Sequence, residues 1–485
     1  MTVVQDRPAA SLVLPSADDP FVAGAVTAVG GPPGRHARLD RRRFWTPVRV
    51  VIALTLLACT LGFLQKLPCR DGADWVNQHQ YTHACYMDLL PLYGGEGLAA
   101  GEVPYFDHNV EYPVLIGGIM QVTATLVKPF EAGDRASRFV DINIALLTAC
   151  AVITAICVSR LAGRRPWDGA MFALAPGLIL AGFINWDLPA AALMGLGMLA
   201  WARKHPLLAG ILFGLGGATK LYPLVLLAPL ALLCIRAGRW RALFTTVVGA
   251  VAAWAAVNVP IALAAPEGWK FFYTFSQERG ADWGSIWYFL QYVRGTPLDV
   301  GLQAGEAPHL LNLAAEVTFA AGLLGVAVLT FVAKQRPRVP QVMFLTLVAF
   351  CLSNKVYSPQ YVIWLLPLAV LARPRWRSLL VWQAGEVLAF FGIWYYLIGI
   401  GVAGQGISGP WYFTALLLRD ALLIGFSVLV VRDILRPEKD VVRRDGVDDP
   451  AGGPLDGASD AFSLRRRTAP VLAEGAGERR PQPAA

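Results

Sequence analysis

The sequence predicts an all-α polytopic membrane protein with about twelve transmembrane helices. Two observations support this fold class. Of the 485 residues, 55% are hydrophobic and only 16% are charged, whereas a typical soluble domain carries about 25% charged residues. Apolar runs that approach or exceed the roughly 20 residues needed to cross a hydrocarbon core recur along the chain. Since backbone polar groups cannot remain unpaired in lipid, we expect these runs to be helices.

Basic residues set the predicted orientation. Most arginines and lysines lie in short connections between apolar runs, and such clusters tend to stay in the cytoplasm. We therefore assign the net charge of +8 to membrane topology and expect no nucleic-acid partner. Both termini are then cytoplasmic. The clusters lie at 41–43, 160–165, 203–204, 236–241, 334–338, 373–377 and 432–439.

One apolar stretch, 112–130, does not fit the alternation of sides. If it crossed the membrane, the arginines at 160–165 would face outward, so we expect an interfacial or re-entrant helix on the outer side. Residues 66–138 then form one large first outer loop. The twelve predicted spans are 47–65, 139–160, 169–184, 187–202, 207–219, 224–235, 241–263, 309–333, 340–353, 360–372, 377–400 and 411–431.

The two ends of the chain have a different composition from the spans. Residues 1–44 and 436–485 are rich in Ala, Gly, Pro and Asp and lack helical periodicity, so we expect disordered cytoplasmic tails. The transmembrane domain is thus predicted at 45–435.

Polar side chains of varied chemistry gather in the predicted outer loops, whereas the inner loops contain almost only Arg, Lys and Pro. This asymmetry predicts a polar site on the extracytoplasmic face. The outer loops contain Asp71, Asp74, His79, His83, Asp88, Glu96, Asp107, His108, Glu111, Asn185, Trp186, Asp187, Gln277, Glu278, Arg279 and Asn354.

Two lysines, Lys220 and Lys355, lie at outer ends of spans, where the positive-inside tendency disfavours cations. Each alone is explained by snorkelling toward lipid headgroups. Two such lysines beside Tyr222, Tyr357 and outward amides favour an anionic ligand, and a phosphate at the membrane surface is the natural candidate.

Three further features leave alternatives open. Cys69 and Cys85 are the only cysteines in the outer loops and form either a disulfide or two free thiols. Trp186 and Asp187 provide either a sugar-stacking face with a polar contact, or an interfacial anchor with a helix cap. Glu386, inside a span, is either a functional residue or a member of a structural pair.

Several motifs follow one another in a specific order. They are Asp88-Leu-Leu-Pro-Leu-Tyr93, Gly101-Glu-Val-Pro-Tyr105, Glu111-Tyr112-Pro113, Asn185-Trp186-Asp187, GLGGATKLYPLVLLAPL at 214–230 and SNKVYSPQYVIWLLPL at 353–368. The chain resembles glycosyltransferase family 87 through these motifs, over most of residues 45–435. That family includes polyprenyl-phosphate-mannose-dependent alpha-1,2-mannosyltransferases.

The resemblance implies a GT-C-like bundle whose first outer loop carries interfacial helices and the catalytic residue. It also implies a polyprenyl-phosphate sugar donor in the membrane, a glycolipid or polysaccharide acceptor and an inverting transfer. No cofactor is expected, because the lipid-linked sugar is itself a substrate and the sequence shows no zinc or phosphate-loop motif.

Asp88 matches the family's loop aspartate and is our candidate general base. Asp74, Asp107 and Asp71 are the next candidates. For the donor phosphate we expect Lys220, Tyr222, Lys355 and Tyr357. For the sugar or acceptor we expect Asp107, His83, His108, Trp186, Asp187 and Asn354.

The alternative function is a transporter or flippase of a lipid-linked saccharide. Transporters place polar residues near the bilayer midplane, whereas here the polar residues gather at one face, which favours the enzyme. A non-catalytic scaffold for envelope assembly is a third interpretation.

Overall fold

The computed structural model describes residues 12–31, 44–72, 75, 78–303, 305–402 and 404–464, and these residues form helices without any β-strand. Six helical segments are long and apolar enough to cross a membrane. This finding supports the predicted integral membrane protein. The helices in these segments are α3 (Pro47–Lys66), α7 (Arg135–Leu161), α14 (Trp240–Ala264), α17 (His309–Val332), α20 (Trp376–Gly401) and α21 (Gly409–Leu435).

The remaining predicted spans also lie on helices, but shorter ones. The span predicted at 169–184 is two short helices, because Pro176 starts a new helix after a break. With 15 residues or fewer in each, these helices leave the number of twelve crossings a prediction. They are α8 (Gly169–Ala173), α9 (Pro176–Ala181), α10 (Leu188–Ala202), α11 (Pro206–Thr219), α12 (Tyr222–Val225), α13 (Leu227–Ala237), α18 (Val339–Ser353) and α19 (Val362–Ala372).

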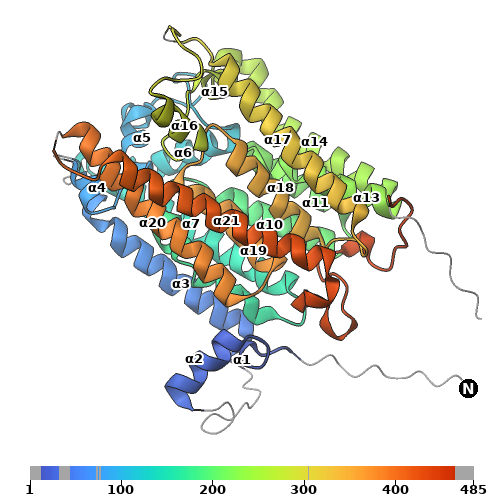
Figure 1. Cartoon of the computed structure of the whole chain (residues 1–485). Coiled ribbons are helices and arrows are strands. Elements are labelled where there is room, and N and C mark those ends of the chain that lie inside the picture. Colours follow the sequence, from blue (N-terminus) through green and yellow to red (C-terminus); the bar gives the residue numbers. More distant parts are fainter. Residues whose placement is uncertain are drawn as a thin grey trace, which may run out of the picture.

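The two ends of the bundle differ in what they carry. The helices of the predicted outer loops gather at the upper and left end in Figure 1, and the N-terminal helices and the C-terminal segment lie at the opposite end. The predicted interfacial stretch 112–130 forms α6, a helix of 14 residues; its position in the interface stays a prediction. The outer-end helices are α4 (His79–Thr82), α5 (Leu89–Gly95), α6 (Val114–Val127), α15 (Pro266–Glu278) and α16 (Ile286–Arg294); the N-terminal ones are α1 (Pro15–Asp18) and α2 (Pro20–Gly30).

Helices α11 and α14 approach each other closely through small residues. Gly210 and Gly214 lie one turn apart on α11, and a Cβ atom at Gly210 would come within 2.0 Å of the backbone oxygen of Thr246. Such small residues allow helix backbones to touch in a membrane. Helix α11 ends at Thr219, directly before Lys220.

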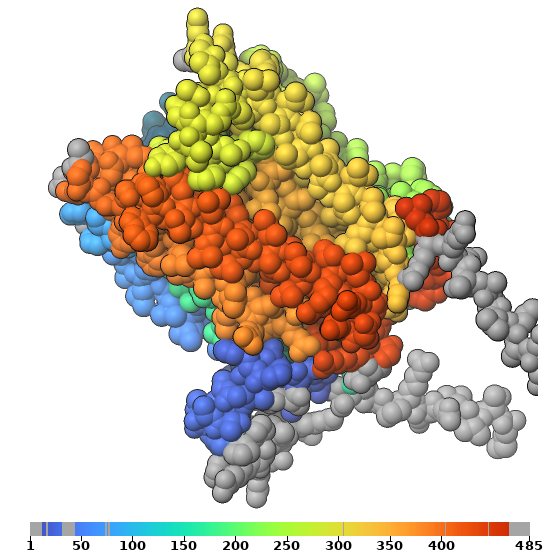
Figure 2. Space-filling view, in the orientation of Figure 1, coloured from blue at the N-terminus to red at the C-terminus, as the bar shows by residue number. Residues whose placement is uncertain are grey.

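The C-terminal segment packs against the bundle, so the predicted disorder of residues 436–485 is wrong for residues 436–464. Buried Arg338 donates to the buried carboxylate of Asp440 at 2.7 Å, and the indole of Trp201 donates to the carbonyl of Gly452 at 2.9 Å. A buried guanidinium at a helix end needs a counterion, which this segment supplies. Figure 2 shows the dark-red segment lying against its neighbours.

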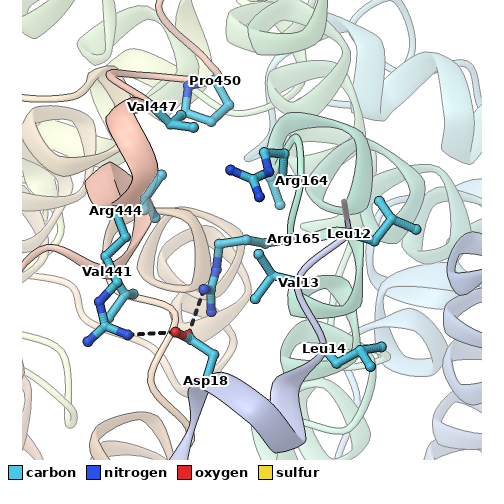
Figure 3. A pocket seen from close by; sticks show the side chains of 12 residues that line it. Leu12, Val13, Leu14, Asp18, Arg164, Arg165, Val441, Arg444, Val447 and Pro450 are labelled. Atoms are coloured by element: carbon cyan, nitrogen blue, oxygen red, sulfur yellow. Dashed lines mark hydrogen bonds and ion pairs between the residues drawn. The ribbon is translucent and has the colours of Figure 1, made fainter. Parts of the chain in front are cut away.

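The N-terminal segment joins the same end of the bundle, and the predicted disorder of residues 1–44 is wrong for residues 12–31. Asp18 accepts hydrogen bonds from Arg165 at 2.6 Å and from Arg444 at 2.7 Å, which links both terminal segments to the helix bundle (Figure 3). Residues 1–11, 32–43 and 465–485 lie outside the described residues.

Candidate active site

A cavity of about 740 Å³ opens at the end of the bundle that carries α4, α6 and α15. Segments far apart in the sequence form its wall: the first outer loop, the α9–α10 and α11–α12 connections, α15, the α18–α19 connection and α20. The charged residues of the wall are Asp88, Glu111, Lys220, Arg279, Asp282 and Lys355.

Asp88 is held from several directions. Its backbone N–H donates to the carbonyl of Ile184 at 2.7 Å, and its carboxylate accepts a hydrogen bond from the amide of Asn185 at 2.6 Å. The Tyr86 hydroxyl donates a second hydrogen bond to the carboxylate. Burial raises the pKa of Asp88 above its usual value, although the two hydrogen bonds and the charge of Lys220 act in the opposite direction. The side chain is therefore a fixed carboxylate with increased basicity.

Asn185 connects this carboxylate to a cation. Its side-chain NH2 also donates to the Tyr112 hydroxyl at 2.7 Å, and its side-chain oxygen accepts from the Lys220 ammonium at 3.3 Å. The ammonium lies 4.8 Å from the Tyr112 ring centre and 3.7 Å from a carboxylate oxygen of Asp187. Lys220 thus faces the cavity beside Asp88, and its role in binding a phosphate stays a prediction.

Asp187 has another position than predicted. It is 1% exposed, does not line the cavity and accepts a hydrogen bond from the indole of Trp364 at 2.7 Å. Its carboxylate is the buried counterion of Lys220 rather than a contact for a sugar.

Three charged residues of the wall, Glu111, Arg279 and Asp282, were absent from the predicted site. Arg279, at the end of α15, forms an ion pair with Asp282 at 3.1 Å. Burial works against its charge, but Asp282 and Glu111 raise the pKa of Arg279 above its usual value. Glu111 is half-buried, and burial raises its pKa. Their positions in the predicted outer loops could have indicated these residues in the sequence, and Glu111 also belongs to the Glu-Tyr-Pro motif.

Lys355 lines the cavity, but its ammonium is used for internal contacts. It donates to the carbonyl of Gln277 at 2.8 Å and to the side chain of Asn312 at 2.5 Å, and so ties α15 to α17. Burial and the nearby charge of Arg279 lower the pKa of Lys355 to about 8. The neighbouring Asn354 also lines the cavity.

The two predicted tyrosines differ. Tyr222 lines the cavity, with its ring stacked on Trp364 at 4.6 Å, and its hydroxyl has no partner among the described residues. Tyr357 is buried outside the cavity, with the guanidinium of Arg419 3.8 Å from its ring centre, so its predicted role in phosphate binding is wrong.

Trp186 cannot present a sugar-stacking face, and this prediction is wrong as well. The residue is fully buried, and its indole donates to the side chain of Asn143 at 2.7 Å. Its ring lies edge-on to Tyr112 and Phe139. The large indole turns inward at this position because burial removes its apolar surface from water.

The other predicted residues of the first loop lie away from the cavity wall. Asp107 is exposed and accepts from the backbone N–H of Val103 at 2.9 Å. One ring nitrogen of His108 lies 3.0 Å from Glu102. Asp71 and His83 do not line the cavity either, and Asp74 lies outside the described residues.

The first loop is closed by a disulfide between Cys69 and Cys85, whose Cα atoms are 5.7 Å apart. Cys85 directly precedes Tyr86 in the chain, and Asp88 follows two residues after Tyr86. Glu386, whose role was open, accepts a hydrogen bond from the indole of Trp382 at 2.8 Å and does not line the cavity, which favours a structural role. Among the described residues, no three His, Cys, Asp or Glu side chains gather as a metal site.

The comparison with protein families supports one class of membrane protein. Residues 122–353 match glycosyltransferase family 87. This match confirms the resemblance seen in the motifs and supports a membrane glycosyltransferase. The family 87 segment contains Asn185, Lys220 and Arg279, and it begins downstream of Asp88.

Solved structures show a distant likeness. ArnT from Cupriavidus metallidurans, bound to undecaprenyl phosphate, is 15% identical with a TM-score of 0.39, over 81% of this chain and 79% of ArnT. The apo oligosaccharyltransferase of Archaeoglobus fulgidus is 12% identical with a TM-score of 0.37, over 81% of this chain and 56% of that one. This chain thus spans little more than half of the archaeal enzyme. Scores this low carry no functional argument, and no curated protein matches the chain.

Proposed function

We propose that the protein transfers a sugar, with mannose as the first candidate, from a polyprenyl-phosphate donor to a hydroxyl group of an extracytoplasmic glycolipid or polysaccharide. The transfer proceeds with inversion. One observation carries this proposal: a single cavity brings the carboxylate of Asp88 together with the cations of Lys220 and Arg279.

Asp88 acts as the general base in this proposal. It takes the proton of the acceptor hydroxyl while the acceptor oxygen forms a bond to the anomeric carbon. The bond between the anomeric carbon and the phosphate oxygen breaks, and its electron pair leaves with the polyprenyl phosphate. A carboxylate whose pKa is raised by burial is a stronger base than an exposed one.

Lys220 and Arg279 stabilise the negative charge that develops on the leaving phosphate. Cations already fixed in the wall stabilise developing charge without having to reorganise during the reaction. Arg279 presents a planar fork to a phosphate, and Lys220 acts as a point charge. Tyr222 and Asn354 line the same wall and complete the proposed phosphate surroundings, whereas the ammonium of Lys355 holds α15 against α17.

The apolar part of the wall suits a lipid-linked donor. Phe272 and Phe275 from α15, with Leu221 beside Lys220, line the cavity next to the cations. We expect the first isoprenoid units to pack against these side chains. The cavity opens on the extracytoplasmic face in this proposal, with both termini in the cytoplasm.

The deciding experiment uses the purified full chain with polyprenyl-phosphate mannose and a mannosylated glycolipid. We expect free polyprenyl phosphate and an extended glycolipid to form together. Movement of the donor across a vesicle membrane with no bond cleavage would instead support the alternative, a transporter or flippase.

A further inference from the structure

Three aromatic rings form one part of the cavity wall, beside Asp88. Tyr81 comes from α4, Tyr86 follows the disulfide, and Trp394 lies on α20; we call these three residues the aromatic wall. Their ring centres are 4.7 to 5.9 Å apart, and their planes are inclined by only 10 to 31° to one another. The rings are therefore nearly parallel and lie at the surface of the cavity.

The chain holds this wall rigidly. Cys85 is fixed by its disulfide to Cys69, and the ammonium of Lys66, at the end of α3, donates to the carbonyl of Tyr86 at 2.7 Å. Such ties keep the Tyr86 ring in one place relative to Asp88. A rigid aromatic face costs little entropy when a ligand packs on it.

A polar atom of the wall has no partner. Trp394 is 4% exposed and lines the cavity, yet its indole N–H makes no hydrogen bond among the described residues. Buried donors are nearly always paired in native proteins. An acceptor oxygen supplied by a ligand would satisfy this donor.

Asp88 links the aromatic wall to the cations. It accepts hydrogen bonds from Tyr86 and from Asn185, and Asn185 in turn contacts Lys220. Helices α4 and α20 lie on one side of this end of the bundle, and α15, which is followed directly by Arg279, lies on another (Figure 1). A displacement with inversion needs groups on two opposite sides of the anomeric carbon, because the nucleophile approaches this carbon opposite the leaving phosphate.

We propose that the aromatic wall binds a sugar ring of the acceptor and directs one of its hydroxyl groups to Asp88. This inference rests on the proposed function. The C–H groups of a pyranose face carry partial positive charge and pack on the negative faces of aromatic rings. The indole of Trp394 donates to a ring hydroxyl. Tyr81 and Trp394 are positioning residues, and a peptide acceptor would lack the flat face that they fit.

The kinetic test compares Tyr81→Leu with Tyr81→Phe, because Leu removes the ring and Phe keeps it. We expect Tyr81→Leu to raise KM for the glycolipid acceptor about three- to tenfold, the range for the loss of one aromatic contact. Tyr81→Phe should restore the wild-type value, and KM for the donor should stay unchanged in both. An unchanged acceptor KM in Tyr81→Leu would overturn the proposal.

A binding test separates this inference from the proposed transfer. Methyl α-mannopyranoside is added to the purified protein, and saturation-transfer NMR detects which sugar protons touch it. We expect signals from the ring C–H groups in the wild type, Tyr81→Phe and Lys220→Gln, and their loss in Tyr81→Leu. This pattern without any transferase activity would reject the proposed function alone. A full signal in Tyr81→Leu would reject the aromatic wall.

Discussion

The amide of Asn185 donates to the carboxylate of Asp88 over 2.6 Å, although 97 positions separate the two residues in the chain. Through Asn185 the first outer loop meets the connection before α10, and the same side chain contacts Lys220 at 3.3 Å. A carboxylate and a cation from different parts of the chain thus share one amide, and the predictions below depend on this arrangement.

Replacing Asp88 by Asn should reduce sugar transfer by about 10²- to 10⁴-fold, the usual contribution of a general base. Asn keeps the size of the side chain and removes its basicity. Transfer is measured as release of polyprenyl phosphate by the purified variant. Asp107→Asn is the matched control, because Asp107 is exposed and outside the cavity. Full activity in the Asp88 variant would reject its role as the base.

The pH dependence of transfer should reflect the raised pKa of Asp88. The base must be deprotonated, so the rate falls as the pH drops through its pKa, and this fall should begin above the usual aspartate value of about 3.9. The Tyr86 hydrogen bond favours the ionised form. Tyr86→Phe should therefore raise the pKa further and shift the acid limb to higher pH, while Tyr81→Phe leaves it in place. The measurement is kcat/KM against pH.

Arg279 and Lys355 make different contacts and should give different defects when replaced. Arg279→Gln should raise KM for the lipid donor about tenfold or more, since a charge-assisted phosphate contact contributes roughly 1.5–3 kcal/mol. Lys355→Met should mainly lower the melting temperature, because Lys355 ties α15 to α17. Donor titrations and thermal unfolding of both variants distinguish these results. A defect confined to donor KM in Lys355→Met would assign the phosphate to Lys355 instead.

Removing the disulfide should destabilise the first outer loop. The bond closes a separation of 16 residues, and loss of such a cross-link costs about 3 kcal/mol in the chain-entropy model. The double variant Cys69→Ala/Cys85→Ala should unfold at lower temperature, and a reducing agent should affect the wild type only. Equal melting temperatures with and without the reducing agent in the wild type would contradict a stabilising role.

The C-terminal segment should stabilise the end of the bundle opposite the cavity. Asp440→Asn leaves the buried guanidinium of Arg338 without its counterion, which typically costs about 3–5 kcal/mol. Asp448→Asn is the control, because Asp448 is half exposed in its pair with Arg443. Thermal unfolding in the same detergent compares the two. A melting temperature equal to that of the control would show that the segment contributes little.

By itself the sequence determined the helices of the predicted spans. These runs lie mainly on helix, because a long apolar stretch has only one way to pair its backbone in lipid, although the run 169–184 is broken before Pro176. The residue types in the outer loops also located the candidate base and one cation, Asp88 and Lys220, since these polar residues stand out in an apolar chain. The order of the motifs indicated the resemblance to glycosyltransferase family 87, which the match over residues 122–353 supports.

Only the tertiary structure decided which of these side chains face one cavity. Trp186 and Tyr357 lie in connections between helices, where no periodicity tells which side chain turns inward, so both were placed in the site although both are buried outside the cavity. Arg279 and Tyr81 enter the site because helices α15 and α4 fold over the same end of the bundle as Asp88. The terminal segments are ordered because buried arginines need counterions, and a composition rich in Gly and Pro does not reveal that need.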